Sequence, residues 1–300
     1  MRLLIRAIVF LVILGSPILA AAQSREFIRH RHQPPVQAPP SAPTPVPSNG
    51  TGMTTGGWCI NYGYQPLVNG QYDMAQVHSD LSYLKAHNYN CLRLAFYGQN
   101  SDVSKSLALA AKANGFYVII GNDGDPMQAG YNTGVIAEAT WAQQNGIDQI
   151  SIGNEASKDL ATQQKLAADS CAVRAVYSGI ISYDTYKAPQ GFDDIKAWAQ
   201  NRGCLDLLGI NLYSDYANTA AELQNLLSAH WYVSETNVDC DYNNQCGDDS
   251  SWASGLQKIL GILTPYGVPI NIFSFNAGGD GVASHWGIIG HPAVMNVVGL

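Results

Sequence analysis

Two apolar segments of the sequence each end in a glutamate. Residues 149–155 read Gln-Ile-Ser-Ile-Gly-Asn-Glu and end at Glu155, and residues 231–235 read Trp-Tyr-Val-Ser-Glu and end at Glu235. Each pattern predicts a buried strand that carries a carboxylate at its C-terminal tip. Burying an ionisable group costs free energy unless a partner compensates for it, so two such strand ends point to a reaction centre.

Glutamate is scarce in the part of the chain that can fold. Beyond residue 57 the glutamates are Glu138, Glu155, Glu222 and Glu235. Glu138 and Glu222 lie in helical patterns, where we expect both to be solvated. In a strand, alternate side chains point to the same face. We therefore expect Gly153 to share a face with Glu155, and Val233 to share one with Glu235, so that both acids point into the same site.

A strand-then-helix alternation begins at residue 58 and repeats eight times. The predicted strands cover residues 58–62, 90–96, 116–121, 149–153, 177–183, 205–212, 231–234 and 269–275. The predicted helices cover residues 74–87, 103–114, 133–145, 156–173, 192–201, 220–229, 251–265 and 292–298. Parallel strands buried on both faces read as continuous apolar runs joined by amphipathic crossovers.

Eight such units in about 245 residues predict an α/β fold of the closed (β/α)8, or TIM barrel, type. A doubly wound open sheet is the structural alternative. Against it, no glycine-rich phosphate loop follows the first strand, which runs instead into Asn-Tyr-Gly-Tyr-Gln-Pro at residues 61–66.

The N-terminal segment resembles an export signal. Residues 1–22 combine two arginines, an apolar run, a Gly-Ser-Pro break and three alanines, and they predict a cleaved signal peptide. The alternative is an uncleaved membrane anchor, which the break and the short apolar run disfavour. Residues 23–57 are rich in proline and predict a disordered linker, which leaves residues 58–300 as a single catalytic domain. We expect a secreted or periplasmic, cell-envelope protein that is not inserted in a membrane after processing.

Charge narrows the possible partners. The net charge is −7, but residues 1–50 contain five arginines and one glutamate, so the remaining 250 residues carry 11 basic and 22 acidic side chains, a net charge of −11. An acidic domain argues against nucleic acid as a partner, while neutral polymers remain open. We expect a monomer.

Six cysteines in an exported chain suggest disulfides. Cys240 with Cys246 is the best pair, because it would close one polar loop. Cys171 with Cys204 is plausible, and Cys59 and Cys91 could equally be buried thiols. The acidic loop at residues 239–249 lacks the glycine and glutamate spacing of a calcium-binding EF-hand, and no His pair has metal-ligand spacing, so we predict no metal and no cofactor.

A TIM barrel carries its chemistry at the C-terminal ends of its strands. The residues that we predict there, besides the two glutamates, are Arg93, Tyr97, Asp123, Asn154, Tyr183, Asp184, Asn211, Tyr213, Phe275 and Asn276. They combine an arginine, amides and aromatic rings around two carboxylates.

These positions resemble the retaining glycoside hydrolases of clan A, a superfamily that includes cellulases, β-glucanases, β-mannanases and β-galactanases. The resemblance covers residues 58–300 and rests on five features: Asn154-Glu155 closing the fourth strand, Glu235 closing the seventh, Arg93 on the second, and Asn211 and Tyr213 on the sixth. It implies that Glu155 is the acid/base and Glu235 the nucleophile, as double displacement requires.

The resemblance also implies roles for the supporting residues. Arg93 would lower the pKa of Glu235, and the ionised neighbour would raise that of Glu155. Tyr213 would donate a hydrogen bond to Glu235, and Asn154 would hold the 2-hydroxyl of the sugar. For Asn154, Arg93 and Tyr213, the alternative is a structural hydrogen bond at the barrel rim.

The sequence departs from the clan at two positions. Clan members commonly place a sugar-stacking tryptophan at the end of strand 8, where this chain has Phe275; the resemblance implies that Phe275 or the later Trp286 serves instead. Many cellulases have proline after the acid/base, where this chain has Ala156. No family within the clan is therefore assigned.

The predicted function is hydrolysis of β-linked oligo- or polysaccharide with retention, of the endo-β-glucanase or β-mannanase type. One alternative is a non-catalytic glycan-binding or envelope protein on a barrel scaffold, which would have no need of paired carboxylates. The other is a transglycosylase that uses the same residues.

Overall fold

Eight parallel strands close into a barrel in the part of the chain that the computed structural model describes. That part comprises residues 58–63, 71–96, 101–122, 124–156, 159–186, 192–214, 216–238, 248–276 and 287–300. Each strand pairs with the next in chain order, and the last pairs with the first. The strands are β1 (Trp58–Tyr62), β2 (Cys91–Phe96), β3 (Tyr117–Asn122), β4 (Gln149–Asn154), β5 (Ile180–Tyr186), β6 (Leu207–Asn211), β7 (Trp231–Thr236) and β8 (Ile270–Ile272). The predicted (β/α)8 barrel is confirmed, while the signal peptide and the linker lie outside the described residues.

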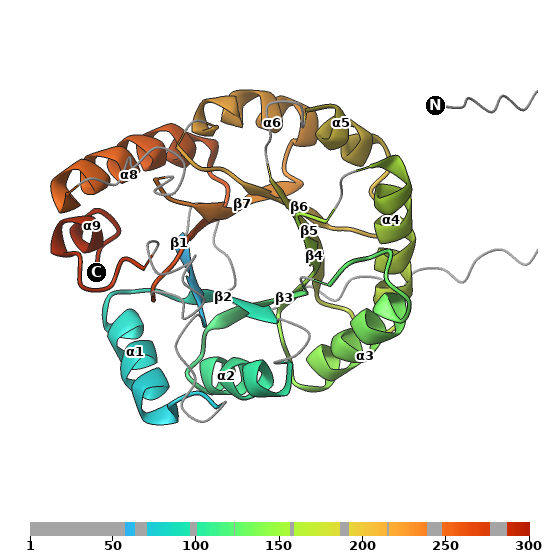
Figure 1. Ribbon diagram of the computed structural model, residues 1–300, viewed down its shortest axis with the longest axis horizontal. Coiled ribbons are helices and arrows are strands. Elements are labelled where there is room, and N and C mark those ends of the chain that lie inside the picture. Colours follow the sequence, from blue (N-terminus) through green and yellow to red (C-terminus); the bar gives the residue numbers. More distant parts are fainter. Residues whose placement is uncertain are drawn as a thin grey trace, which may run out of the picture. The chain divides into compact units, whose positions relative to one another are not determined.

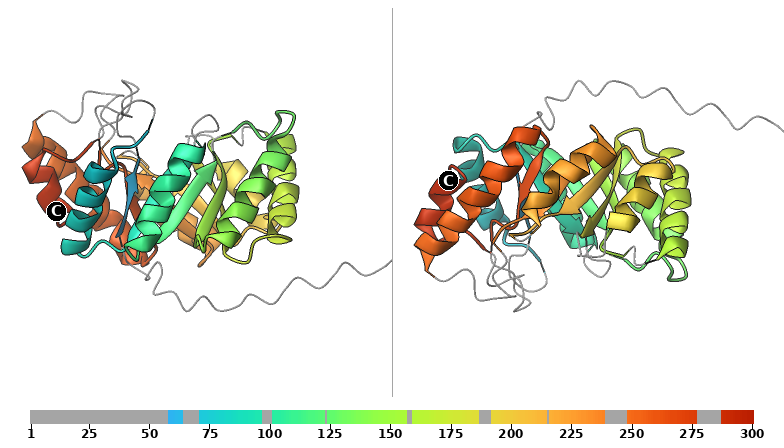
Figure 2. Two further views of the ribbon diagram at one scale, coloured as in Figure 1. Left: turned by 90° about the horizontal axis from the view of Figure 1, so that it is seen from below. Right: turned by 90° about the horizontal axis from the view of Figure 1, so that it is seen from above.

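Helices surround the barrel (Figure 1) and are seen from the side in Figure 2. The α-helices are α1 (Met74–Ala86), α2 (Ser101–Ala113), α3 (Tyr131–Gln144), α4 (Leu160–Arg174), α5 (Phe192–Gln200), α6 (Ala220–Leu227), α8 (Asp249–Leu263) and α9 (Pro292–Val297). Short 3-10 turns, η1 (Ala217–Thr219) and η2 (Thr264–Tyr266), precede α6 and follow α8. No helix in the described ranges has the length and apolar character needed to cross a membrane.

The last helix completes the ring between α8 and α1 (Figures 1 and 2). The Tyr89 hydroxyl, just before β2, donates a hydrogen bond to the Val298 carbonyl at 2.8 Å. This bond ties the C-terminal end of the chain to the segment that enters the second strand.

The alternation of side chains along the strands separates two environments. Outward-facing residues such as Ile60, Leu92 and Ile150 pack in the main apolar core with side chains of the helices. Inward-facing residues near the strand beginnings form a small separate cluster, made of Cys59, Cys91, Tyr117 and Ile119. Polar side chains fill the interior above that cluster, and they build the site described below.

Aspartates fasten the strands at the N-terminal end of the barrel. Asp148, before β4, accepts hydrogen bonds from the Lys112 ammonium at 2.7 Å and from the Val118 backbone N–H at 2.8 Å. Asp206, before β6, accepts from Arg174 and from the Ile181 backbone N–H. The same arrangement thus joins neighbouring strands twice, at the end opposite to the strand tips.

Strand β5 begins three residues later than predicted. The Tyr177 backbone N–H bonds to the Val173 carbonyl at the end of α4, and its hydroxyl donates to the Ile147 carbonyl at 2.8 Å, so Tyr177 belongs to the turn before the strand. The strand also ends later than predicted, at Tyr186, so Asp184 lies inside β5 and not beyond its end.

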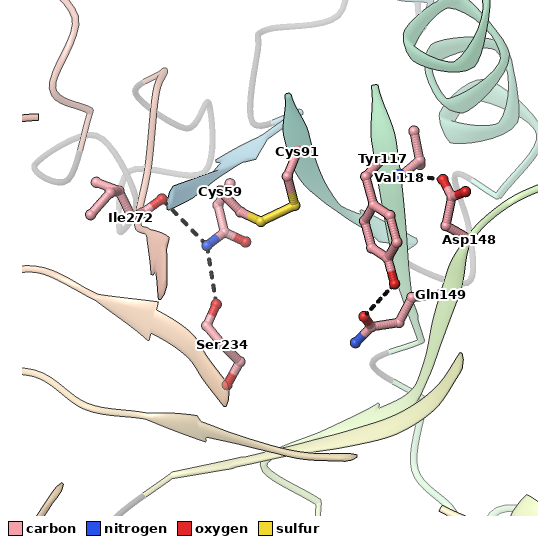
Figure 3. Close-up of a disulfide and its surroundings, with 9 residues drawn as sticks. Cys59, Cys91, Tyr117, Val118, Asp148, Gln149, Ser234 and Ile272 are labelled. Atoms are coloured by element: carbon pink, nitrogen blue, oxygen red, sulfur yellow. Dashed lines mark hydrogen bonds between the residues drawn. A yellow bond between two sulfur atoms is a disulfide. The ribbon is translucent and has the colours of Figure 1, made fainter. Parts of the chain in front are cut away.

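Two disulfides lie in the described part of the chain. Cys59–Cys91 joins the neighbouring strands β1 and β2 inside the barrel, with Cα atoms 4.6 Å apart, close to Tyr117 and Gln149 (Figure 3). Cys171–Cys204 joins α4 to the segment before β6, as predicted. The two cysteines left open as thiols are therefore bonded, because paired strands place them side by side. Cys240 and Cys246 lie outside the described residues.

The two disulfides close loops of nearly equal length, with sequence separations of 32 and 33 residues. Loop-closure entropy predicts that each stabilises the fold by about 3 to 4 kcal/mol. We expect the C59S/C91S and C171S/C204S variants to lose similar amounts of unfolding free energy in urea titrations. A much larger loss for C59S/C91S would show that the barrel interior depends on that bond for packing, beyond the effect of loop closure.

Candidate active site

Arg93 is the central residue of the candidate site and lies in the barrel interior. It lies on β2, is 2% exposed, and its guanidinium contacts partners on three other strands. Nε and Nη2 donate to Asp184 Oδ2 at 3.1 and 2.8 Å, and Nη1 donates to Asn61 Oδ1 at 2.8 Å and to Glu235 Oε1 at 2.9 Å. Two carboxylates therefore share one buried positive charge.

Glu235 is held at both carboxylate oxygens. Arg93 binds Oε1, and the Tyr213 hydroxyl donates to Oε2 at 2.7 Å. The residue is 6% exposed. The structure thus brings Arg93 and Tyr213 to Glu235, the contacts that the sequence analysis predicts.

Glu155 lies in a more open environment. It follows β4 in a left-handed backbone conformation, with φ of 53°, and its side chain is half-buried. Asn211 Nδ2 donates to Glu155 Oε1 at 2.7 Å and lies 3.3 Å from Asn154 Oδ1. The Ser234 hydroxyl binds Asn211 Oδ1 at 2.7 Å and so fixes which way the amide points.

Bulges, and not simple alternation, direct the two acids. Ile210 pairs with Val233 but Asn211 pairs with Glu235, so β7 carries one extra residue, Ser234, between those pairs. Tyr232 and Ser234 point inward, where they bind Asp184 and Asn211, and Val233 points into the outer core. The expectation that Val233 and Glu235 share a face is wrong, because the bulge turns Glu235 inward.

Strand β4 also departs from regular alternation near its end. Its register against β5 shifts by one residue between Ser151 and Asn154. A Cβ added to Gly153 would lie 3.0 Å from the ring of Tyr183, which packs outside the barrel. Gly153 therefore faces the helices and not the site, contrary to the prediction, and the glycine leaves room for that ring.

Burial raises the pKa of Glu235 to about 7 from an ordinary value of 4.5. The charge of Arg93 acts in the opposite direction and lowers this pKa, but its effect is smaller than that of burial. Glu155 and Asp184 nearby also raise this pKa, and the Tyr213 hydrogen bond lowers it. The expected influence of Arg93 is present, but the expected net direction is wrong because burial outweighs the guanidinium.

Two predicted aromatic contacts lie elsewhere. Tyr183 is fully buried and stacks on Trp198 of α5, with ring centroids 5.1 Å apart. Phe275 is 1% exposed and stacks on Tyr62. Neither ring can stack on a sugar, because strand alternation turns Tyr183 away from the barrel and packing against the first strand covers Phe275. Tyr97, Asp123 and Trp286 lie outside the described residues.

Glu138 is also placed differently from the prediction. It is 9% exposed, and it accepts a hydrogen bond from Asn122 Nδ2 at 2.8 Å. It therefore supports the end of β3 and is not a solvated helix residue. Glu222 is exposed, as predicted.

Asp184 was predicted at a strand end but without its contact to Arg93, and three further residues that build the site, Tyr232, Asn61 and Ser234, were not predicted, nor was the nearby ring of Phe273. Asp184 and Tyr232 bind one another, and Asp184 binds Arg93, while Asn61 and Ser234 position Arg93 and Asn211. Phe273 meets the ring of Tyr213 edge-on, with centroids 6.3 Å apart. The available signal was the run of polar residues at inward positions of otherwise apolar strands, in particular Ser182 and Asp184 on β5.

The described residues hold no group of three or more His, Cys, Asp or Glu side chains that could bind a metal ion. The polar groups of the site are three acids, Glu155, Asp184 and Glu235, an arginine shared by Asp184 and Glu235, and hydrogen-bonding neutral side chains. This arrangement is suited to proton transfer and carboxylate attack.

The eight-stranded barrel is a fold that solved glycoside hydrolases share. Comparison of the sequence with protein-family models and with curated proteins finds no match. Solved structures do match. The GH113 β-mannanase AaManA from Alicyclobacillus acidocaldarius superposes with a TM-score of 0.58 at 14% identity, covering 82% of this chain and 96% of that one.

Two further structures extend the comparison. A glucosidase from Croceicoccus marinus gives a TM-score of 0.60 at 12% identity, over 82% of this chain and 67% of that one. A GH5-4 broad-specificity endoglucanase from an uncultured bacterium gives 0.53 at 11% identity, over 82% and 93%. At these identities the similarity shows the fold, which is the fold that the clan A resemblance implies.

The raised pKa of Glu235 predicts a pH-dependent cost in stability. Between pH 4.5 and 7 the unfolded chain releases this proton while the folded protein holds it, so the free energy of unfolding falls as the pH rises through this window. The full cost, on the order of 3 kcal/mol, is present above pH 7. Glu235→Gln should therefore raise the melting temperature at pH 8, and raise it much less at pH 5.

Glu222→Gln is the matched control, because it neutralises an exposed glutamate on α6. It should change the melting temperature little, and equally, at both pH values. If Glu235→Gln behaved in the same way, Glu235 would be titrating as an ordinary surface acid.

Proposed function

We propose that this protein is a retaining glycoside hydrolase that cleaves β-linked oligo- or polysaccharide. The observation that carries the proposal is the pair of strand-end glutamates in unlike environments: Glu235 buried and bound by Arg93 and Tyr213, and Glu155 half-buried and bound by Asn211. Retaining glycosidases need two carboxyl groups with different tasks, and different surroundings are the means of separating them.

In the first proposed step, Glu155 donates its proton to the glycosidic oxygen as the bond to the anomeric carbon breaks. Glu235 attacks that carbon and forms a covalent glycosyl-enzyme. In the second step, Glu155 removes a proton from water, and the oxygen of that water attacks the anomeric carbon and releases Glu235. Two inversions give net retention.

The neighbouring residues fit these tasks. Arg93 and Tyr213 hold both oxygens of Glu235, which orients one of them for attack. We assign Asn154, which lies beside Glu155, to the 2-hydroxyl of the sugar, a contact that strengthens in the transition state. The half-exposed position of Glu155 allows water to reach it in the second step.

The substrate class and the location are part of the proposal. The structural neighbours include a β-mannanase and an endoglucanase, which favours internal cleavage of a β-mannan or β-glucan. The two disulfides support export, since such bonds persist in oxidising compartments. We assign residues 1–22 to the signal peptide, 23–57 to the linker and 58–300 to the catalytic domain.

The nucleophile is tested by reducing-sugar release from a panel of soluble β-glucans, mannans, galactans, xylans and cellulose derivatives. Wild-type protein should release sugar from at least one polymer, and Glu235→Ala should abolish that release because no covalent intermediate can form. Glu222→Ala serves as the control and should retain full activity. Near-normal turnover by Glu235→Ala would remove it as the nucleophile, and binding without cleavage by the wild type would favour a glycan-binding protein.

The acid/base is tested with substrates that differ in leaving group. Glu155→Ala should lose roughly 10²- to 10⁴-fold on unactivated substrates, the usual contribution of general acid catalysis. It should still cleave activated aryl glycosides, and added azide should accelerate it by replacing water. Equal losses on both kinds of substrate, with no response to azide, would argue against this role.

A further inference from the structure

Asp184 is a buried carboxylate that the proposed mechanism does not use. It lies on β5, is fully buried, and has both side-chain oxygens engaged. Oδ2 accepts two hydrogen bonds from Arg93, at 3.1 and 2.8 Å, and Oδ1 accepts the Tyr232 hydroxyl. Asp184 thus takes more hydrogen bonds from Arg93 than Glu235 does.

The barrel makes room for this carboxylate. Gly209, the inward-facing residue of β6 next to Asp184, has no side chain, and an added Cβ would collide with Asp184 Oδ1 and with Ser234. The backbone of Asp184 is used as well, because its carbonyl accepts the Glu155 N–H at 2.9 Å, which anchors the left-handed residue. Asp184 therefore contacts both Arg93, which binds Glu235, and the backbone of Glu155.

A chain of hydrogen bonds reaches Asp184 from the disulfide-bonded end of the barrel and fixes its position. Tyr117 donates to Gln149, Gln149 donates to Ser182 at 2.9 Å, and the Ser182 and Tyr232 hydroxyls lie 3.2 Å apart. Tyr232 is fully buried, and burial followed by the charge of Asp184 raises its pKa well above the ordinary value, so it stays a neutral donor. The chain leads from the disulfide-bonded end of the barrel to the arginine.

We propose that Asp184 is a positioning residue that holds the plane of Arg93 and takes up part of its charge, and thereby raises the pH at which Glu235 ionises. The charged and titratable groups around Glu235 in the described residues are Arg93 on β2, Glu155 after β4, Asp184 on β5, Tyr213 after β6 and Tyr232 on β7. The inference rests on the proposed function for its catalytic meaning, but its charge argument does not.

The net charge of the Arg93–Asp184–Glu235 cluster depends on whether Glu235 is protonated. With Glu235 protonated, Arg93 and Asp184 cancel; with Glu235 ionised, the buried cluster carries one uncompensated negative charge. Without Asp184 the cluster would be positive when Glu235 is protonated and neutral when it is ionised. Losing Asp184 should therefore favour the ionised nucleophile at lower pH.

The test replaces Asp184 by asparagine, which keeps the size and can still accept from Arg93 while donating to Tyr232. The sequence contains five glutamates, so labelling with [5-13C]glutamate gives five carboxyl signals, and Glu235→Gln identifies that of Glu235 by its loss. We expect the titration midpoint of Glu235 to fall by about one pH unit in Asp184→Asn, because a nearby like charge is removed. Tyr232→Phe, which keeps the charge of Asp184, should not lower it.

Activity provides the second readout. The acidic limb of the kcat/KM profile should move to lower pH with the titration midpoint, so that the activity at pH 5 relative to pH 8 rises about tenfold in Asp184→Asn. If Asp184→Asn does not fold, Asp184→Ser removes the same charge and carries the same expectation. An unchanged Glu235 midpoint in the folded variant would overturn the inference and leave Asp184 a structural residue. A lowered midpoint in a protein whose wild type cleaves no glycoside would uphold the inference and reject the proposed function.

Discussion

One buried guanidinium shared by two carboxylates is the interaction on which the rest of the site depends. Arg93 binds Asp184 and Glu235 in the barrel interior, where water is largely excluded. Buried ion pairs recover their desolvation cost only when the remaining donors and acceptors are also satisfied. Neutral groups meet that requirement, since Tyr232, Tyr213 and Asn61 complete the hydrogen bonds of the three charged side chains. This explains why the barrel interior above the disulfide is polar, although the usual filling of such barrels is branched apolar side chains.

The strands place these groups by departing from regular alternation near their ends. A regular β7 would point Tyr232 and Ser234 inward and Glu235 outward, into the helix layer. The extra residue in β7 lets all three reach the interior. The equivalent shift in β4 ends with Glu155 in a left-handed conformation that its hydrogen bond to the Asp184 carbonyl holds. In β7 the bulge therefore supplies what regular alternation cannot, an acid at the tip in addition to the inward residues below it.

The eightfold repeat was predictable from the sequence, and so were the two acids. Parallel strands covered by helices must be apolar on their outward face, which leaves a readable rhythm, and a glutamate at the end of such a run stands out because glutamate is scarce here. The direction of each acid was predicted correctly from an incorrect premise. Bulges depend on pairing between strands, and one strand read by itself carries no sign of them.

Side chains that act through another residue were hidden for a related reason. Asp184 was read as lying beyond its strand because the turn containing Tyr177 is as apolar as the strand that follows. In the structure Tyr183 turns outward onto Trp198, and Asp184 turns inward onto Arg93. Alternation along β5 thus decides which of two adjacent residues reaches the site.

The different depths of the two glutamates fit the division of labour proposed for them. Glu235 belongs to a strand, and its oxygens are bound by Arg93 from β2 and by Tyr213 from the segment after β6, so its position is fixed as the proposed nucleophile requires. Glu155 lies past the end of its strand and is bound by one amide, so it retains access to solvent and to a proton. A group that must exchange protons with both a leaving oxygen and water has to be reachable from the cleft, whereas a group that forms a bond gains from immobility. In the proposed mechanism, position along the strand, before any detail of pKa, separates the two roles.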